Sequence, residues 1–265
     1  MKIRRGKGSR EGNRLSNIQS LERALNIINI LAYSEKPVGV TEIGKLLGIH
    51  KSTAYRLILT LRQFGYVEQD EETERYYLGL KPLELSNIIL ERLDIRKIAH
   101  PYLEELSGRV NETVHLAVRE EDEIVYIDKV ESKQAIRMYS RVGARAPLYC
   151  TALGKCLLAF GPQELIEKWI FKKELPPRTE STIKTGEELQ KELMEIKRLG
   201  YALDREEFEQ GVKCIGVPIL NKSERAIAAI SISIPAFRVT EEKIQDFIPI
   251  LLETGEKISK RLKFL

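Results

Sequence analysis

The sequence predicts an α+β protein in two parts: an N-terminal winged helix-turn-helix, and a larger C-terminal domain on a mostly antiparallel sheet, joined by a linker helix. Three observations support this fold class. Residues 16–80 show three stretches of helical periodicity, followed by two short strand-like runs around an acidic turn. Residues 81–97 continue as one amphipathic helix. Residues 98–265 contain paired alternating apolar runs, with helical segments before and after them.

The composition restricts the class of protein. The chain has 265 residues, of which 43% are hydrophobic and 31% are charged, which fits two globular domains and excludes a disordered chain. No apolar run approaches the roughly 18 residues that span a bilayer, and the basic start lacks the apolar segment of a secretory signal. Three cysteines are too few for a disulfide framework. We therefore expect a cytoplasmic protein with free thiols and no membrane partner.

The excess positive charge is confined to the N-terminal part of the chain. Up to Val67 there are 12 Lys and Arg against 4 Asp and Glu, whereas residues 68–80 carry 5 acidic side chains and 1 basic one. The net charge of the whole chain is +4, so residues 81–265 contribute none of it. A basic domain followed by a neutral one predicts nucleic acid as the partner of the first and a different partner for the second.

The N-terminal segment reads as an arm followed by a helix. Residues 1–15 are rich in Gly, Arg and Lys and predict a disordered basic arm, which either touches DNA or is only a surface tail. The first helix begins near Ser16 or Ser20, either of which could cap it, and ends near Tyr33. Its apolar positions recur at helical spacing: Leu21, Ala24, Leu25, Ile28 and Leu31.

The second helix is short and ends at a sharp corner. Thr41 is its expected N-cap, and Ile43, Leu46 and Leu47 are expected to face inward. Gly48 follows at the position where a left-handed residue would end the helix. Two helices separated by such a corner predict a helix-turn-helix.

The third helix, from about Lys51 to Gly65, has two different faces. The apolar face, which would pack onto the domain, consists of Ala54, Leu57, Ile58 and Leu61. The polar front end consists of Lys51, Ser52, Thr53, Tyr55 and Arg56. In a helix-turn-helix the N-terminal residues of this helix meet the major groove, so we expect these five to contact phosphates and bases of double-stranded DNA. An ordinary solvated surface helix is the alternative.

Residues 66–80 predict the hairpin that forms the wing. Its tip is acidic, because it carries Glu71, Glu72 and Glu74, which a phosphate backbone would repel. Either the tip points away from DNA, or Arg75 is the only wing contact. The linker helix, residues 81–97, carries an apolar stripe that needs a partner, so we expect a homodimer on a pseudo-palindromic operator.

Residues 98–265 form the second predicted domain. Residues 98–109 open it as a helix, and hairpins turn at residues 120–123 and 221–224. The segment QAIRMYSRV is expected as a further strand. Helices are expected after YCTALGK, over GEELQKELMEIKRLG and over residues 241–262.

Three features of the second domain suit a small ligand. Thr151 could cap a helix and leave the N–H groups of residues 152–154, including Gly154, for an anion. Ser231 and Ser233 alternate with isoleucines along a strand, and Cys214 lies on a similar weakly polar face. Asp204 is expected as a loop carboxylate. A plain capped helix, a solvent-facing sheet and a solvated loop acid are the alternatives.

Three segments of the sequence resemble those of a known protein family. GIHKSTAYRLILTLRQFGYV, PLYCTALGKCLLAF and GYALDREEFEQGVKCIGVPI resemble the IclR family of bacterial transcription regulators, over residues 18–263. The resemblance implies a GAF-like effector-binding domain, a homodimer formed through the DNA-binding domains and linker, and often a dimer of dimers. It also implies a repressor controlled by a small organic acid.

Within the family, DEIVYIDKVES, IRMYSRVGARAPLYCTALGK and EEFEQGVKCI are most similar to the repressors of pectin and hexuronate catabolism that sense 2-keto-3-deoxygluconate. The resemblance implies that the ligand's carboxylate meets the helix start, and that its hydroxyls meet the acid and the serines. It places in the pocket Met138, Ala152, Leu153, Asp204, Val212, Cys214, Ser231 and Ser233.

Two alternative functions would depend on the thiols of the three cysteines. Cys150, Cys156 and Cys214 could belong to a redox or metal sensor, or to a GAF-like enzyme with a catalytic cysteine. The chain has no C-x-x-C spacing and no recognisable nucleophile–base motif, and cysteines are often plain core residues. We therefore expect no catalytic residue, no metal ligand and no cofactor.

Overall fold

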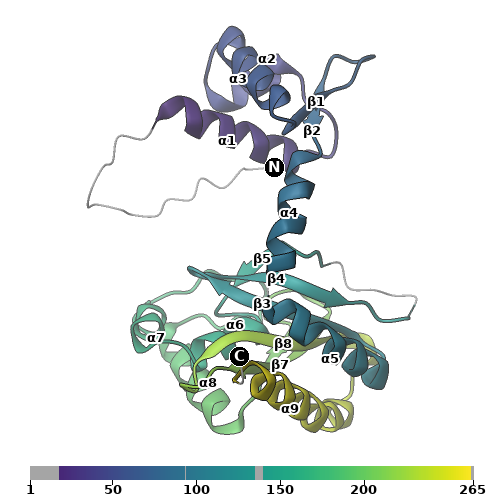
Figure 1. Cartoon of the computed structure of the whole chain (residues 1–265). Coiled ribbons are helices and arrows are strands. Elements are labelled where there is room, and N and C mark those ends of the chain that lie inside the picture. The colour runs from purple at the N-terminus through teal and green to yellow at the C-terminus, as the bar shows by residue number, and fades with distance from the viewer. Residues whose placement is uncertain (1–17, 93, 135–139, 264–265) are drawn as a thin grey trace. The chain divides into compact units, whose positions relative to one another are not determined.

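The computed structural model describes residues 18–92, 94–134 and 140–263. The chain forms two compact units that divide between Ile89 and Leu90 (Figure 1). The predicted arm, residues 1–15, lies outside the described residues. The predicted division into DNA-binding, linker and effector-binding segments is a division by function and stays a prediction.

The N-terminal unit is a winged helix-turn-helix. It contains α1 (Gln19–Ala32), α2 (Val40–Leu47), α3 (Lys51–Gln63) and a two-stranded antiparallel sheet of β1 (Val67–Gln69) and β2 (Tyr76–Leu78). Its core joins all five elements and consists of Ile27, Leu31, Val38, Ile43, Ala54, Ile58, Val67 and Tyr76. The predicted order of helices and hairpin is confirmed.

The corner between α2 and α3 depends on two glycines. Gly48 ends α2 in the left-handed conformation, with φ of 66°, as the sequence predicted. Gly44 is buried, and a Cβ there would lie 3.1 Å from the carbonyl oxygen of Ile49. Since Gly44 makes this close approach, α2 turns its Ile43–Gly44 side inward and leaves Leu46 51% exposed, so the expectation that Leu46 faces inward is wrong.

The helix starts differ from the predicted caps. Gly39, not Thr41, is the N-cap of α2, and Ile18 is the N-cap of α1; neither helix has a side-chain cap. Ser20 therefore lies inside α1, and Ser16 lies outside the described residues. α1 is buried through Ile27 and Leu31, so Leu21 and Leu25 remain exposed.

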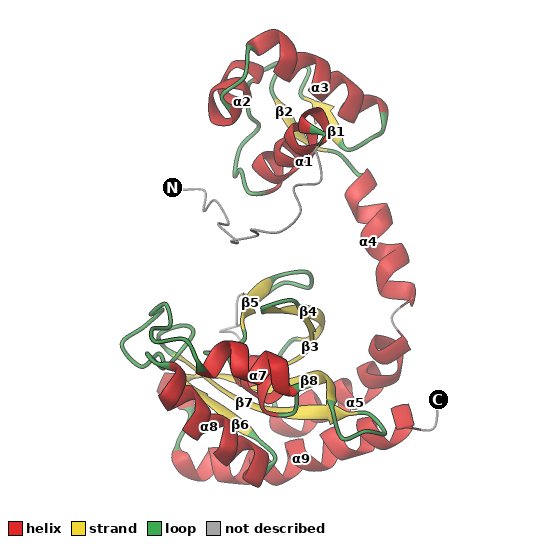
Figure 2. Cartoon of the chain, turned by 90° about the vertical axis from the view of Figure 1, so that its left-hand side faces the viewer, coloured by secondary structure: helices red, strands yellow, loops and turns green. Residues whose placement is uncertain are grey.

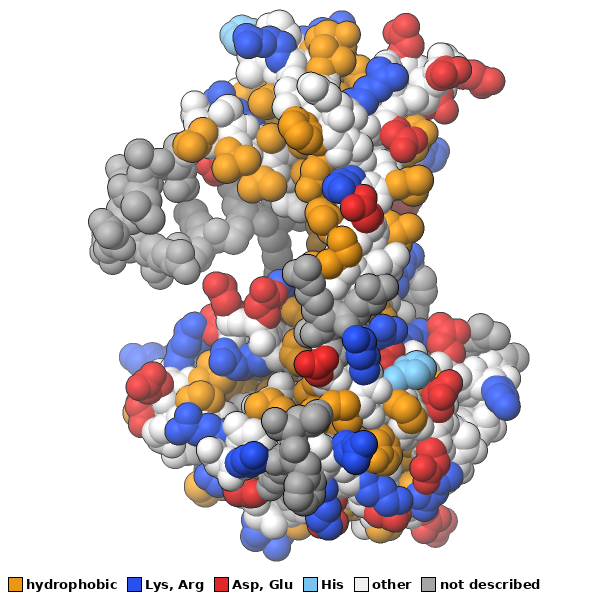
Figure 3. Space-filling view, in the orientation of Figure 1, with side chains coloured by type: hydrophobic (Ala, Val, Ile, Leu, Met, Phe, Trp, Pro, Cys, Tyr) orange, Lys and Arg blue, Asp and Glu red, His pale blue; other side chains and the backbone are white. Residues whose placement is uncertain are grey.

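Apolar side chains gather on the surface of the N-terminal unit over α1 and the first turns of α4 (Lys81–Arg92), as Figure 3 shows. The most exposed ones are Leu21 and Leu25 on α1 with Ile18 at its N-cap, and Leu80, Leu83 and Ile89 around α4. Such a contiguous apolar surface marks an interaction site more often than a solvent face.

The C-terminal unit is built on one six-stranded antiparallel sheet in the order β5-β4-β3-β8-β7-β6. The strands are β3 (Thr113–Glu120), β4 (Glu123–Val130), β5 (Arg145–Pro147), β6 (Ala202–Arg205), β7 (Val212–Leu220) and β8 (Ala226–Pro235). The hairpins β3–β4 and β7–β8 turn where the sequence predicted.

Helices cover both faces of this sheet (Figure 2). α5 (Asp94–Val110) and α9 (Glu241–Lys263) pack together on one face, and α6 (Ala152–Ala159), α7 (Gln163–Ile170) and α8 (Gly186–Leu199) belong to the other. A short 3-10 turn, Ala236–Arg238, joins β8 to α9. None of the described helices is long and apolar enough to cross a membrane.

Strand β8 divides its side chains between the two faces, as its alternation predicted. Ile230, Ile232 and Ile234 belong to the core with α5 and α9. Ser231 and Ser233 point to the side of α6 and are buried there, which excludes a solvent-facing sheet surface.

Other boundaries differ from the prediction. The predicted linker segment, residues 81–97, contains α4 (Lys81–Arg92) and the start of α5 (Asp94–Val110), and residue 93 between them lies outside the described residues. The helix α7 and the short strand β5 were not predicted. Asp204 lies on strand β6 rather than in a loop. Most of the predicted strand QAIRMYSRV lies outside the described residues.

Candidate functional site

The predicted DNA-contacting residues lie at the start of α3. Lys51, Ser52, Tyr55 and Arg56 are exposed, and Thr53 is half-buried. The opposite side of α3 is anchored in the core by Ala54 and Ile58. Within the described part of the chain neither Lys51 nor Arg56 has an ion-pair partner. The arrangement therefore presents two cations and three hydroxyl groups at one helix end.

The wing has a different character. Its tip residues Glu71, Glu72 and Glu74 are exposed. Arg75 donates a hydrogen bond to the carbonyl oxygen of Pro37 at 2.9 Å and lies 3.7 Å from a carboxylate oxygen of Glu42. Arg75 Nη1 is therefore engaged within its own unit, while the side chain as a whole is 49% exposed.

A cavity of about 270 Å³ lies in the C-terminal unit, between the sheet and the start of α6. Seven of the nine predicted effector residues line it: Ala152, Leu153, Asp204, Val212, Cys214, Ser231 and Ser233. Of the other two, Met138 lies outside the described residues, and Gly154 is not part of the cavity wall.

Strand register brings the polar wall together. Asp204 on β6 is paired with Cys214 on β7, which is paired with Ser233 on β8, so the three side chains form a row on one face. In the next row, Gly216 on β7 is paired with Ser231. A Cβ on Gly216 would lie 2.9 Å from the carbonyl carbon of Ala152, so this glycine is what lets α6 approach the sheet.

The start of α6 forms the opposite wall. Thr151 is its N-cap, as predicted, and its Oγ1 accepts a hydrogen bond from the N–H of Gly154 at 3.0 Å. The Gly154 N–H is therefore occupied, which corrects its predicted availability for a ligand. The N–H groups of Ala152 and Leu153, in the first turn, have no acceptor within the helix. Two backbone donors thus remain next to the cavity.

The structure adds lining residues that the sequence did not indicate: His115, Tyr126, Ser140, Ala144, Arg145, Phe208 and Glu209. Thr151, predicted as the N-cap, lines the cavity as well. The ring of His115 lies 2.7 Å from Ser140 Oγ through Nε2 and 3.3 Å from Ser233 Oγ through Nδ1. It also meets Tyr126 edge to face, with ring centroids 5.2 Å apart. The alternation of apolar and polar residues in TVHLAV was the one sequence signal that could have placed His115 on this face.

Burial controls the protonation of these groups. Burial, with a smaller effect of Lys129, lowers the pKa of His115 to about 3, so its imidazole is neutral. Burial raises the pKa of Tyr126, which keeps its phenol protonated. Burial and then the nearby Glu207 raise the pKa of Asp204 to about 7, although the N–H of Glu207 donates to Asp204 Oδ1 at 2.7 Å.

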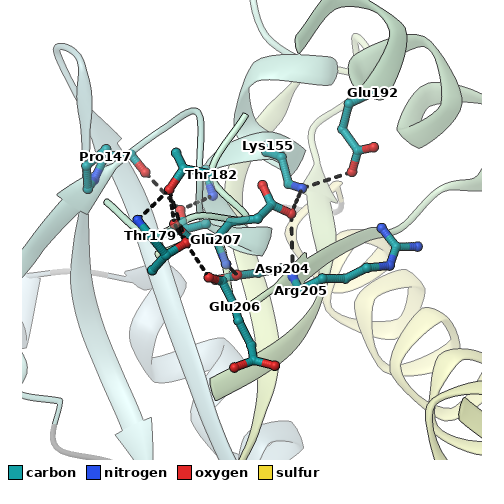
Figure 4. A network of polar contacts seen from close by, with 11 residues as sticks. Pro147, Lys155, Thr179, Thr182, Glu192, Asp204, Arg205, Glu206 and Glu207 are labelled. Carbon is teal, nitrogen blue, oxygen red and sulfur yellow. Dashed lines mark hydrogen bonds and ion pairs between the residues drawn. The ribbon is translucent and has the colours of Figure 1, made fainter. Parts of the chain in front are cut away.

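An ion cluster lies directly behind Asp204 (Figure 4). Lys155, on α6, is completely buried, and its Nζ lies 2.6 Å from Glu207 Oε1 and 2.9 Å from Glu192 Oε1. Burial opposes the charge of Lys155, but the two carboxylates outweigh it and raise its pKa. Burial raises the pKa of Glu207. Thr182 Oγ1 donates to the Glu207 carbonyl at 2.6 Å, which fixes the backbone of the loop after β6.

The cysteines are not arranged as reactive thiols. Cys150 and Cys156 are buried, and burial raises the pKa of each to about 12. Cys214 lies 3.2 Å from Ser233 Oγ, and burial raises its pKa as well. Since the thiolate is the reactive form, these environments disfavour thiol chemistry. In the residues that the structure describes, no group of three His, Cys, Asp or Glu is placed to hold a metal ion.

Comparison with known proteins places both units in one family. The model of the IclR helix-turn-helix domain matches residues 20–71, and that of the bacterial transcriptional regulator IclR C-terminal domain matches residues 88–260. The HTH-type transcriptional regulator KdgR of Escherichia coli is 38% identical to the chain, covering 93% of this chain and 94% of that protein. The DNA-binding transcriptional repressor YiaJ of Escherichia coli is 34% identical, covering 97% and 92%.

A solved structure adds a ligand. The crystal structure of an IclR homologue from Microbacterium hydrocarbonoxydans, complexed with 4-hydroxybenzoate, matches with a TM-score of 0.79 and 25% identity. The match covers 93% of this chain and 100% of that one.

Proposed function

Since the chain belongs to the IclR family of DNA-binding transcriptional regulators, which are not enzymes, we propose that it is a repressor whose operator binding is controlled by a small organic acid held in the cavity of its C-terminal unit. The relative YiaJ is itself a repressor, and the homologue complexed with 4-hydroxybenzoate holds a small carboxylic acid. The convergence of predicted residues on one cavity is the observation that carries the proposal.

The cavity suits a small hydroxylated acid. Its volume of about 270 Å³ lies near the lower end of the range for ligand pockets, which is roughly 300–1,000 Å³. The N–H groups of Ala152 and Leu153 at the start of α6 would bind the carboxylate. Ser231, Ser233 and Asp204 would bind hydroxyl or keto oxygens. Together with the resemblance of the surrounding segments, this favours 2-keto-3-deoxygluconate as the first ligand to test.

At the other end of the chain, we propose that Lys51, Ser52, Thr53, Tyr55 and Arg56 contact the operator. The charge of α3 and its exposure support this. The exposed apolar residues of α1 and α4 support pairing with a second copy, as a homodimer or a dimer of dimers. A two-fold assembly would recognise a pseudo-palindromic site.

A binding experiment tests the DNA interface. Anisotropy of a labelled operator fragment would be measured over a salt series for Lys51→Ala, Arg56→Ala and wild type. Each variant should bind more weakly, and loss of one phosphate contact should reduce the slope of log affinity against log salt by about 1. Lys191→Ala, which removes an equal charge from an exposed position on α8, is the matched control and should bind like wild type. Wild-type binding by both α3 variants would refute the interface.

A second experiment tests the ligand. Small keto and sugar acids would be screened by their effect on the melting of the full chain and then measured by calorimetry. Binding at about 100 times the dissociation constant should stabilise the C-terminal unit by about 2.7 kcal/mol. The same ligand should change the affinity for the operator fragment. If no acid binds, or if binding leaves DNA affinity unchanged, the proposed control is wrong.

A further inference from the structure

The cavity proposed to hold an organic acid has a strongly negative side. Asp204 and the exposed Glu209 line it, and the charge of Glu207, which is itself paired with Lys155, also acts on Asp204. Asp204 is only 4% exposed, so water screens its charge poorly. An acid anion that enters the cavity therefore approaches one buried carboxylate that already has a second beside it.

The basic side chains around Asp204 are already engaged. Lys155, on α6, is held between Glu207 and Glu192. Arg145 lines the cavity and is ion-paired with Glu120 and Glu123.

Arg178, on the segment before α8, lies over the ring of Phe208 with 5.2 Å between the guanidinium carbon and the ring centroid. None of these cations is paired with Asp204 in the described residues.

The remaining titratable neighbours are uncharged near neutral pH. His115 on β3 is neutral because burial lowers its pKa to about 3. Burial raises the pKa values of Tyr126 on β4, Cys150 before α6 and Cys214 on β7. Near neutral pH these four groups do not change charge, so they cannot compensate for an added anion.

The backbone N–H groups of Glu207 and Phe208 both face the Asp204 carboxyl group and favour its ionised form, but the one hydrogen bond of ordinary length in the described residues goes to Oδ1. Asp204 Oδ1 accepts the N–H of Glu207 at 2.7 Å, a contact that fixes the orientation of the carboxyl group. The side chain lies in the row with Cys214 and Ser233 on the cavity wall. A proton on Oδ2 would remove the repulsion of an acid anion and create a hydrogen-bond donor facing it.

We propose that Asp204 binds the organic acid as a neutral carboxylic acid and donates a hydrogen bond from Oδ2 to a ligand oxygen, so that each bound anion brings one proton from solvent into the cavity. This inference rests on the proposed function. It gives Asp204 a role in specificity: the residue selects a ligand with an oxygen acceptor at this point and disfavours an ammonium group, which would require the ionised form. The burial of Asp204 beside Glu207, which raises its pKa to about 7, supports the uptake of a proton near neutral pH.

Calorimetry of the full chain tests the proposal. The acid that binds, 2-keto-3-deoxygluconate first, would be titrated from pH 6 to pH 8.5, and at pH 8 in two buffers with different ionisation enthalpies. Proton uptake should approach one per ligand at pH 8 and fall toward zero at pH 6. Above about pH 7 the affinity should weaken about tenfold per pH unit, because the unliganded protein must first take up the proton.

Two Asp→Asn variants show which group takes up the proton when the acid binds. Asp204→Asn keeps an acceptor for the Glu207 N–H and should bind with no proton uptake and no pH dependence. Asp246→Asn, on an exposed position of α9, is the matched control and should retain both. If Asp204→Asn does not fold, the wild-type proton count decides by itself.

The outcomes separate this inference from the proposed function. Binding without proton uptake, or uptake that persists in Asp204→Asn, would overturn the inference and leave the function intact. Proton release with an amine ligand that binds more tightly than any acid would also overturn it. No binding of any acid at any pH would overturn the proposed function and, with it, this inference.

Discussion

Replacement of Lys155 by methionine should destabilise the C-terminal unit through the charge that it leaves behind. Lys155 is completely buried on α6, and its Nζ contacts Glu207 at 2.6 Å and Glu192 at 2.9 Å. Methionine has a similar length and no charge, so it fills most of the same space. The principal effect of Lys155→Met is therefore that Glu207, which is 5% exposed, loses its cation.

The size of the stability loss follows from how deeply Glu207 and Glu192 are each buried. Removing one partner of a buried ion pair typically costs about 3–5 kcal/mol. The side chain of Glu192 is 26% exposed and can turn toward solvent, so most of the cost comes from Glu207. We expect a loss of about 3–5 kcal/mol in the free energy of unfolding, part of which Lys155→Met/Glu207→Gln should recover.

The way in which the stability loss of Lys155→Met changes with pH tests the same reasoning a second time. Burial already raises the pKa of Glu207, and Lys155 opposes that rise. Without Lys155 the folded-state pKa of Glu207 rises further above its unfolded value. Its contribution to stability is then present at low pH and lost as the pH rises through the folded-state pKa. The defect of Lys155→Met should therefore be larger at pH 8 than at pH 5.

Urea unfolding followed by tryptophan fluorescence measures this directly. The chain contains one tryptophan, and Trp169 is buried on α7 in the same unit, stacked on Tyr149. Lys191→Met is the matched control, because its ion pair with Glu187 is exposed and should be worth less than about 1 kcal/mol. A loss in Lys155→Met no greater than that of the control, or one that does not change with pH, would refute the reasoning.

Three further expectations can be checked with the same protein. Gly154→Ala should lower the midpoint of the Trp169 transition, because the new Cβ would lie 2.5 Å from Leu148 Cα, whereas Gly108→Ala meets open space in α5 and should raise stability by about 0.5–1 kcal/mol. Leu83→Glu, at a side chain 59% exposed on α4, should shift sedimentation toward the monomer and leave the Trp169 transition unchanged. The contribution of Asp204 to the free energy of unfolding should fall from about pH 4 to about pH 7, because its pKa is raised from 3.8 to about 7 on folding; since His115, whose pKa is lowered to about 3, contributes in the opposite direction, the fall is measured as the difference between wild type and Asp204→Asn across this range.

The winged helix could be predicted because its signals are local. Helical periodicity, a glycine at the left-handed position after α2 and two strand-like runs are each visible within a few residues. The inward faces of α1 and α2 could not be predicted in the same way. They depend on which residues closely approach the neighbouring chain, as Gly44 approaches the backbone of the α2–α3 turn at Ile49, and several registers of a leucine-rich helix satisfy the same periodicity.

Contacts between distant residues explain most of what the sequence did not reveal about the cavity. Lys155 and Glu207 are 52 positions apart, and Ser233 and His115 are 118 positions apart. The alternation of side chains along one strand can be read within a few residues, and it showed that Ser231 and Ser233 share a face. It could not show that the face is covered by α6, nor that Tyr126 on β4 reaches the same space. Gly154 was assigned to the ligand because a cap leaves N–H groups free, whereas the cap itself uses the N–H of Gly154.

The strand register is the step that converts these local patterns into one site. Asp204, Cys214 and Ser233 become neighbours only because β6, β7 and β8 pair at these positions. A shift of β7 by one residue would turn Cys214 away from the cavity and bring Ile215 into the row. The shift would also move Gly216 away from Ala152, where a Cβ would lie 2.9 Å from the backbone of α6. Close packing of the helix start on Gly216 and the polar row on the sheet therefore require the same register, so a sequence that secures the packing also secures the position of Asp204.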